Sequence, residues 1–317
     1  MDTVNSVLGP VKIDDLGFTL MHEHVIVSAA GIPQDYPELL GSNFIDSAVQ
    51  SLSLAKKGGI DTIVDATTLD LGRDVNVLAR VSRLSGVNIV ACTGWWLEEP
   101  IFLIGASADQ LAQVFIREIQ EGISGTGIKA GILKAASDVS GVTDWQKTVL
   151  RAVARAHLAT GVPIMLHSYS PGRVGEGQLA ILKDEGVNPG RVKVDHSNDT
   201  TDIDYLIRLL EQGCYLGMDR YPGRNVSPME RTRTMKTLID AGYVDRLLPS
   251  HDHVPVEITG TSLEAIELHK EREKSNPHGY LYLKKVVMPQ LRNMGVPEAI
   301  LSRLCHTGPR NFFAGVD

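Results

Sequence analysis

Two histidines, His22 and His24, are separated by a single residue and are the first candidate metal ligands in the sequence. Alternate residues of an extended strand point to the same side, so both imidazoles can reach one ion. A bare His-x-His pair is a weak signal, because two polar residues in a turn give the same pattern more often. Glu23, which lies between them, is interpreted as a spacer with no ligand role.

Three further metal-compatible residues each follow a short, largely apolar run. They are His167, His196 and Asp252, which come after Pro163–Leu166, Val192–Asp195 and Leu247–His251. In a barrel of parallel strands the carboxyl ends of the strands converge on one face, where the active sites of that fold lie. We therefore expect five side chains, from the ends of strands one, five, six and eight, to meet at a metal centre.

Lys134 belongs to the same set, because it closes the apolar run Gly131–Leu133 and is expected at the end of strand four. An ammonium group beside divalent cations is electrostatically unfavourable. Either Lys134 loses its charge or it is chemically modified. Lys129, at the opposite end of the same strand, is expected to be an exposed surface residue.

Eight short apolar runs alternate with longer segments of helical periodicity, which is the pattern of parallel βα units. Helices are expected over Asp144–Thr160, Thr201–Gln212 and Pro228–Ala241. The sequence predicts one α/β domain over residues 1–317, a (β/α)8 TIM barrel in which about residues 260–317 add C-terminal helices across the barrel. The expected strands are Phe18–Met21, Thr62–Asp65, Asn88–Thr93, Lys129–Lys134, Pro163–His167, Val192–His196, Cys214–Asp219 and Arg246–Ser250.

Composition excludes several classes of protein. The net charge of -7 and the absence of a basic cluster disfavour nucleic-acid binding. No apolar run approaches the roughly 20 residues that span a bilayer, and the first residues lack the pattern of a signal peptide, so no membrane association and a cytoplasmic location are expected. Cys92, Cys214 and Cys305 are scattered and odd in number, which indicates buried, reduced thiols.

The order of these motifs resembles the phosphotriesterase family of the amidohydrolase superfamily, and the resemblance extends over essentially the whole chain. The segments that carry it are Met21–His24, Asp70–Asp74, Gly127–Lys134, Ala159–Pro163 leading to His167, His196–Asp199, Ser250–Asp252 and Gly308–Phe313.

The resemblance implies a binuclear metal centre. His22, His24 and Asp252 hold the more buried ion, and His167 and His196 hold the more exposed one. Lys134, carboxylated by carbon dioxide, bridges both, which removes the electrostatic objection above. Nitrogen and oxygen ligands suit Zn2+ best, with Co2+, Mn2+ or Fe2+ also acceptable. Relatives are commonly homodimers, so a homodimer is expected.

The expected reaction is metal-assisted hydrolysis, in which a water that bridges the metals is deprotonated and attacks a carbonyl or phosphoryl centre. Asp252 orients the resulting hydroxide, accepts a proton and passes it toward Asp199. An N-cap of the following helix is an equally good interpretation of Asp199. The substrate is expected to be a small ester, lactone or organophosphate.

The substrate pocket has mixed features. Arg220, after Gly217–Asp219, and the short loop Tyr221–Val226 resemble the lactonase branch of the family, whereas Trp96 resembles triesterases. Arg220 either holds a lactone carbonyl or an acidic group, or forms a salt bridge at the barrel rim. The segment His253–Gly260 lacks the aromatic residues of a triesterase leaving-group pocket. Pocket residues are expected to be Trp96, Leu97, Leu71, Arg220 and Tyr221.

These features favour a lactonase or carboxylic esterase that also hydrolyses activated phosphotriesters slowly. The first alternative is an enzyme that is primarily an aryldialkylphosphatase. A minor alternative is a barrel that binds metal or ligand without turnover, although all six expected metal-site residues are present. A deacetylase or amidase from elsewhere in the superfamily is disfavoured by Lys134 on strand four.

Overall fold

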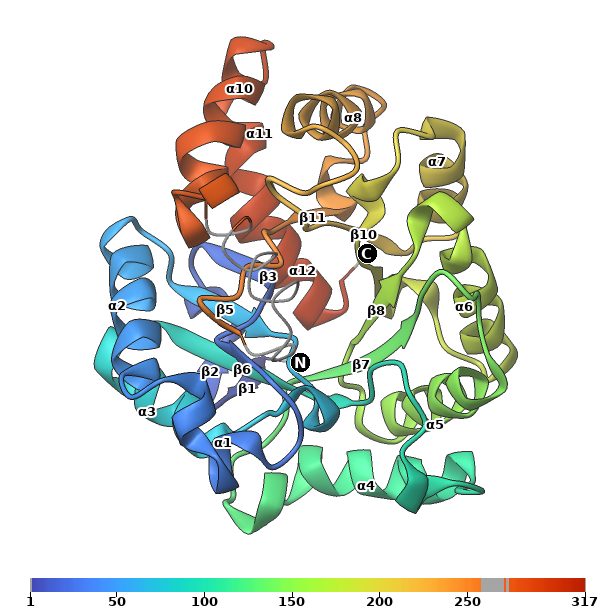
Figure 1. The fold of residues 1–317 in the computed structure, drawn as a ribbon. Coiled ribbons are helices and arrows are strands. Elements are labelled where there is room, and N and C mark those ends of the chain that lie inside the picture. Colours follow the sequence, from blue (N-terminus) through green and yellow to red (C-terminus); the bar gives the residue numbers. More distant parts are fainter. Residues whose placement is uncertain (1, 258–270, 272–273, 317) are drawn as a thin grey trace.

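A ring of eight parallel strands forms the centre of the protein in the computed structural model, which describes residues 2–257, 271 and 274–316 (Figure 1). Each strand is hydrogen-bonded to the next one along the chain, and a bond from the Asp252 N–H to the His22 carbonyl oxygen (3.1 Å) joins the two ends of the sheet. The predicted (β/α)8 barrel is therefore confirmed. The strands are β3 (Thr19–Glu23), β5 (Thr62–Asp65), β6 (Asn88–Gly94), β7 (Ile132–Ser137), β8 (Ile164–Ser168), β9 (Val192–Val194), β10 (Tyr215–Met218) and β11 (Leu247–Pro249).

Helices surround this sheet on the outside (Figure 1). The predicted helix Asp144–Thr160 is confirmed at both ends, because Thr143 and Gln146 form a capping box and Gly161 ends the helix in a left-handed conformation. The other two predictions differ by one or two residues at their ends. The helices are α2 (Phe44–Lys57), α3 (Val75–Ser85), α4 (Ala108–Gln120), α5 (Asp144–Thr160), α6 (Val174–Asp184), α7 (Ile203–Glu211) and α8 (Pro228–Asp240).

One predicted strand is displaced. β7 begins at Ile132 and ends at Ser137, so Lys134 is its third residue and Lys129 precedes it. Alanine has a low strand propensity, so the residues after Lys134 carry little strand signal. Ala135, Ala136 and Ser137 nevertheless pair with β8, where their small side chains are fully buried.

Short elements lie at both ends of the barrel: the first hairpin lies near the amino-terminal ends of the strands, and a short strand pair and a short helix follow their carboxyl ends. β1 (Thr3–Ser6) and β2 (Gly9–Lys12) form a hairpin, and β4 (Ile26–Val27) pairs with β12 (Val256–Glu257) farther along the chain. α1 (Ile32–Asp35) follows β4.

The C-terminal segment is helical where the structure describes it, as predicted. It contains two π-helical turns and the helices α10 (Met288–Asn293), α11 (Glu298–Ser302) and α12 (Gly308–Ala314). α12 lies across the barrel, where the Phe312 ring contacts the ring of Tyr215 on β10 (centroids 5.0 Å apart) (Figure 1). Residues 258–270 and 272–273, including part of the segment after Asp252, lie outside the described residues.

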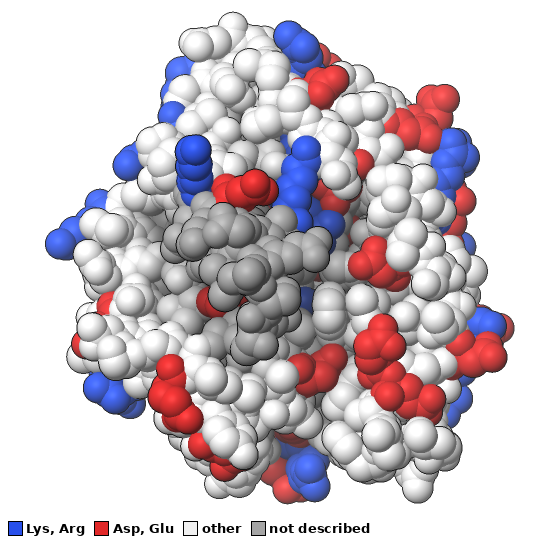
Figure 2. Space-filling view, viewed as in Figure 1, with Lys and Arg blue, Asp and Glu red and all other residues white. Residues whose placement is uncertain are grey.

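Charged side chains, helices and thiols of the described residues bear on the expectations from composition. Acidic and basic side chains are interspersed on the described part of the face in Figure 2, without a continuous basic field. No helix in the described part of the chain is long and apolar enough to cross a membrane. Cys92, Cys214 and Cys305 are buried and free.

Asp61 links the first two barrel strands. Its Oδ2 accepts a hydrogen bond from the Phe18 N–H just before β3 (3.0 Å), and its Oδ1 accepts one from Lys56 Nζ at the end of α2 (2.9 Å). Partial burial raises the pKa of Asp61, but these two partners more than offset that effect, so the pKa lies below its ordinary value. The ionised carboxylate therefore stabilises the fold.

Asp61→Asn should lower the free energy of unfolding at pH 7 by about 1 kcal/mol, because one good acceptor for a backbone N–H is lost. Because the pKa is depressed on folding, the difference should persist above pH 4 and shrink as the pH falls through the folded-state pKa. Urea titrations of both proteins at several pH values measure it. Asp14→Asn, at a carboxylate whose side chain is 81% exposed, is the control; an equal loss there would contradict the assignment.

Candidate metal centre

Three candidate ligands come together where the last strand meets the first. Asp252 Oδ1 lies 3.5 Å from His22 Nε2 and 3.3 Å from His24 Nε2. His22 is in β3 and His24 follows it, while Asp252 lies in the turn after β11. Their donor atoms therefore face a common point.

His167 and His196 form a second group beside the first. His167 Nδ1 lies 2.8 Å from His196 Nε2, and the His22 and His196 ring centroids are 4.9 Å apart. His22, His196 and Asp252 also have donor atoms within 4.8 Å of one another, which is close enough for one ion. The structure thus brings together all five predicted histidine and aspartate residues.

Carboxylates fix the orientation of one histidine from each group. His22 Nδ1 lies 2.9 Å from Asp195 Oδ2, and His196 Nδ1 lies 2.9 Å from Asp219 Oδ1. An ionised carboxylate only accepts hydrogen bonds, so these contacts assign the proton of each neutral ring to Nδ1. The Nε2 lone pairs of His22 and His196 are then directed at the candidate metal positions.

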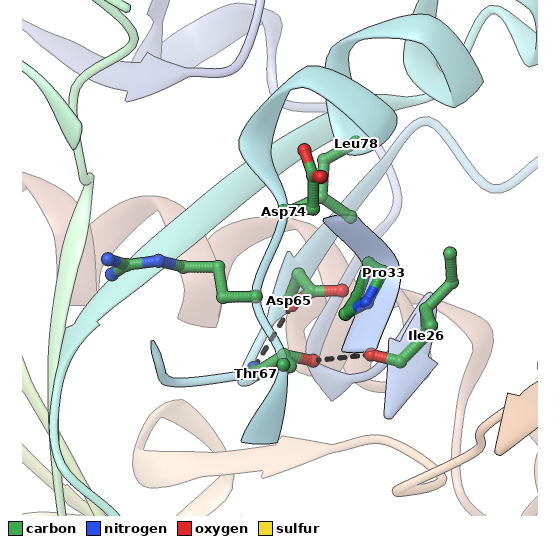
Figure 3. Close-up of a pocket in the computed structure, with 8 residues that line it drawn as sticks. Ile26, Pro33, Asp65, Thr67, Asp74 and Leu78 are labelled. Atoms are coloured by element: carbon green, nitrogen blue, oxygen red, sulfur yellow. Dashed lines mark hydrogen bonds between the residues drawn. The ribbon is translucent and has the colours of Figure 1, made fainter. Parts of the chain in front are cut away.

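The remaining two histidines are oriented in the same way. His24 Nδ1 lies 2.8 Å from Thr67 Oγ1, and His167 Nε2 lies 3.4 Å from Asp138 Oδ2. Figure 3 shows that the Thr67 hydroxyl donates to the Ile26 carbonyl oxygen (3.3 Å), beside a small crevice of about 10 Å³. The hydroxyl has a single proton, so the His24 ring donates to it and keeps its Nε2 lone pair free. In their neutral forms all four rings therefore direct the nitrogen that metal binding requires toward the candidate centre.

Lys134 lies within reach of both groups. Its side chain is buried in the barrel, and its Nζ donates to the Ala66 carbonyl oxygen (2.7 Å). Burial is the main cause that lowers the pKa of both His24 and His167, and the charge of Lys134 lowers both further. Ala66 directly precedes Thr67, the hydrogen-bond partner of His24, and β7 pairs with β8, the strand that carries His167. Gly94 permits the packing here, because a Cβ atom at Gly94 would lie only 1.9 Å from the Lys134 carbonyl oxygen.

Two candidate ligands have an unusual backbone conformation. His196 and Asp252 have φ values of 59° and 55°, in the left-handed region that costs a residue other than glycine about 1–2 kcal/mol. Hydrogen bonds from the His196 N–H to Asp219 (2.8 Å) and from the Asp252 N–H to His22 (3.1 Å) help to maintain it. Backbone strain of this kind is concentrated at functional sites.

Burial and neighbouring charges shift the pKa values of the candidate ligands. Burial lowers the pKa of His167 to about 4 and that of His196 well below its ordinary value. Burial raises the pKa of Asp252, but the neighbouring histidines and Arg220 bring it well below its usual range. Burial lowers the pKa of His22, but two carboxylates more than offset this and raise it to about 9. Near neutral pH, His22 must therefore release a proton when it binds an ion.

Arg220 joins Asp252 to Asp199. Its Nε donates to Asp252 Oδ2 (3.1 Å) and its Nη1 donates to Asp199 Oδ2 (2.6 Å), while Arg231 pairs with the other Asp199 oxygen (2.7 Å). Asp199 is therefore held between two guanidinium groups. The following helix is capped by Asp202 instead, so the N-cap interpretation of Asp199 is wrong.

The predicted pocket residues lie in different environments. The Trp96 ring is half-buried and contacts His167 edge to face, with centroids 6.1 Å apart. Tyr221 is only 1% exposed and stacks on Tyr282 in the interior (centroids 6.4 Å apart), so it presents little surface to a substrate. The other two predicted residues, Leu71 and Leu97, are half-buried.

Four charged residues around the ligands were missed as site residues. Lys193, Asp195 and Asp219 are fully buried beneath His22 and His196. Lys193 and Asp195 alternate with valines in β9 and just beyond it, and charged residues in an otherwise apolar barrel strand were the signal that could have found them.

Glu23, the fourth, is more than a spacer. Its buried carboxylate accepts hydrogen bonds from Ser250 Oγ (2.7 Å), from the N–H and Nδ1 of His251 (3.0 and 2.6 Å) and from the His253 N–H (2.9 Å). These donors lie on both sides of Asp252, so Glu23 fixes the turn that carries this ligand.

Known proteins are similar to this chain over nearly its whole length. A model of the phosphotriesterase family matches residues 2–313. A phosphotriesterase homology protein of Mycobacterium tuberculosis is 37% identical over 99% of this chain and 98% of its own. An aryldialkylphosphatase of Saccharolobus solfataricus is 35% identical over 96% of this chain and 97% of its own. A phosphotriesterase homology protein of Escherichia coli is 30% identical over 96% of this chain and all of its own.

Glu23→Gln should reduce the metal content of the purified protein. The glutamine amide places an NH2 group where the carboxylate accepted hydrogen bonds, so the turn around Asp252 shifts. A buried donor left without an acceptor costs about 1–3 kcal/mol, so the free energy of unfolding should fall by a similar amount. Elemental analysis and urea unfolding measure both effects, with the exposed Glu98→Gln as control. Wild-type metal content in Glu23→Gln would refute this function of Glu23.

Proposed function

Because this chain belongs to the phosphotriesterase family and is a metal-dependent hydrolase, we propose that it hydrolyses lactones and carboxylic esters at a binuclear metal centre, with slower hydrolysis of activated phosphotriesters. The observation that carries the proposal is the convergence of four imidazole rings and the Asp252 carboxylate in the barrel that also buries Lys134. Such a set of nitrogen and oxygen donors without thiolate suits Zn2+ and related divalent ions.

Each group of ligands holds one ion in this proposal. His22, His24 and Asp252 hold the more buried ion, and His167 and His196 hold the more exposed one. Lys134 serves both positions after carboxylation, which converts its cationic end into an anion. The family resemblance supports this modification, and so does the burial of Lys134 inside the barrel, where its Nζ contacts the Ala66 carbonyl oxygen (2.7 Å).

The bound ions supply a water of lowered pKa and polarise the oxygen that gains negative charge during hydrolysis. Asp252 directs Oδ1 toward the ligands while Arg220 holds its Oδ2. A guanidinium group has no lone pair for an incoming proton, so Arg220 is a positioning group and not a proton carrier. A proton that passes from Asp252 to Asp199 therefore requires Arg220 to move aside or a water to bridge the two carboxylates.

Arg220 and Trp96 select the substrate in this proposal. The Arg220 side chain is 32% exposed, and its contact with Asp252 places a cationic group next to the reacting centre. It is available to a lactone carbonyl or an acidic substituent, which supports the lactonase assignment. Trp96 beside His167 provides an apolar wall for an acyl chain.

A primary aryldialkylphosphatase is the second candidate. The relative that is named for that activity, at 35% identity, favours it, and so does Trp96, which resembles the triesterase residue. The two candidates share the metal centre and differ only in the preferred electrophile.

We expect kcat/KM for γ- or δ-lactones to exceed kcat/KM for an aryl dialkyl phosphate. Both activities should disappear together on chelation and return with Zn2+ or Co2+, because they use the same centre. Parallel initial-rate measurements on one preparation test this. A preference for the phosphate by orders of magnitude would exclude the lactonase, and no turnover of any substrate would revive a binding function.

Lys134→Ala should lose most bound metal and most activity, because the only proposed ligand that contacts both ions is removed. Lys129→Ala is the matched control, since Lys129 is exposed and precedes the same strand. Metal analysis and mass spectrometry of the native protein, which detects a carboxylated lysine, measure the result. If Lys134→Ala kept both metals and the full rate, Lys134 would not be a bridging ligand.

A further inference from the structure

We propose that Lys193 is a positioning residue that couples the two metal positions through Asp195 and Asp219. The inference rests on the proposed binuclear centre but concerns residues that do not themselves bind metal in it. Lys193 is in β9, and Asp195 and Asp219 directly follow β9 and β10. All three side chains are buried inside the barrel.

Lys193 occupies the position that a bound cation could take. Its side chain is fully buried, its Nζ donates to the Met21 carbonyl oxygen (2.9 Å), and it pairs with Asp195. Asp219 Oδ2 lies 3.8 Å from the same Nζ. One ammonium group therefore lies between two buried carboxylates and the strand that carries His22.

Through these two carboxylates, Lys193 is connected to both groups of ligands. Asp195 contacts His22 (2.9 Å), whereas Asp219 contacts His196 (2.9 Å) and also His22 (3.4 Å). Asp219 thus touches one imidazole from each proposed metal position. A displacement of Asp219 changes the orientation of both rings at once.

The crowding of the carboxylates explains why a cation is needed. They flank Gly217, where a Cβ atom would lie 2.4 Å from Asp195 Oδ1 and 2.3 Å from Asp219 Oδ2. Two like charges this deep in a barrel repel each other strongly unless a counter-charge is present. Removal of one partner of a buried ion pair leaves an uncompensated charge, so without Lys193 the two carboxylates should move apart.

A purely structural ion pair is the competing explanation, and the protein contains one for comparison. Arg73 pairs with Glu118 (2.8 Å) between the loop before α3 and helix α4, and both residues are buried. Their remaining partners include the Cys92 carbonyl oxygen and the Thr93 hydroxyl, and none of these contacts reaches a candidate ligand. Removal of the Arg73–Glu118 ion pair should lower the free energy of unfolding without changing metal binding.

The test is Co2+ binding to metal-free Lys193→Met, measured by chelator competition and by the visible spectrum of the bound ion, which depends on coordination geometry. Outer-shell partners of metal ligands contribute about 10–100-fold to affinity, so both Co2+ equivalents should bind that much more weakly, with an altered spectrum. Glu118→Gln should lose stability in urea but keep wild-type affinity and spectrum.

Two further variants test which carboxylate connects Lys193 to which metal position. Asp195→Asn should weaken mainly one of the two Co2+ equivalents, because His22 is the candidate ligand that Asp195 contacts. Asp219→Asn should weaken both. If Lys193→Met does not fold, Lys193→Met/Asp195→Asn replaces the ion pair with neutral side chains and should fold while still binding both ions weakly.

The outcomes separate this inference from the proposed function. Wild-type Co2+ affinity and spectrum in a folded Lys193→Met protein, or in the double variant, would overturn the coupling function. Loss of affinity in Glu118→Gln equal to that in Lys193→Met would also overturn it, because general destabilisation would then explain the effect. Failure of the wild-type protein to bind two Co2+ ions would instead overturn the binuclear centre.

Discussion

The orientation of four imidazole rings is the constraint on which the candidate site depends. A histidine binds metal through the lone pair of one nitrogen, and the hydrogen bond made by the other nitrogen decides which one is free. Here an oxygen acceptor outside each ring takes the N–H, and these acceptors are fixed in turn. Thr67 is held by a backbone carbonyl group, Asp195 by an ammonium group, and Asp219 by a backbone N–H. The barrel interior therefore determines the chemistry of the ligands before any ion is present.

Arg220 forms the rim salt bridges that one of its two interpretations predicts, and they place it beside the proposed substrate site. Its salt bridges with Asp252 and Asp199 are those of a residue that stabilises the barrel rim. The same contacts direct a permanent positive charge at the reacting centre, since Asp252 is itself a candidate ligand. Asp199, between Arg220 and Arg231, is then an anchor for the guanidinium group that also contacts Asp252.

The barrel and the ligands could be predicted from the sequence because both leave local signals. Apolar runs that end in His167, His196 or Asp252 mark strand ends, and the fold places all strand ends together. The boundaries of β7 could not be found, since Ala135 and Ala136 carry no strand preference. The supporting network could not be found either, because the contacts of Glu23 with His251 and His253 join residues more than two hundred positions apart. Spacing along the chain does not show which partner satisfies a buried charge.

The contact between the last and first barrel strands affects the order in which the protein folds and can bind metal. His22 and Asp252 are joined there by a backbone hydrogen bond, so the first group of ligands exists only when the two ends of the sheet have met. Contacts of such long sequence separation form late, because the entropy of closing the intervening chain opposes them. During synthesis on the ribosome, a nascent chain that lacks β11 would have His22 and His24 without their third partner. In the proposed centre, metal uptake is thereby coupled to completion of the barrel.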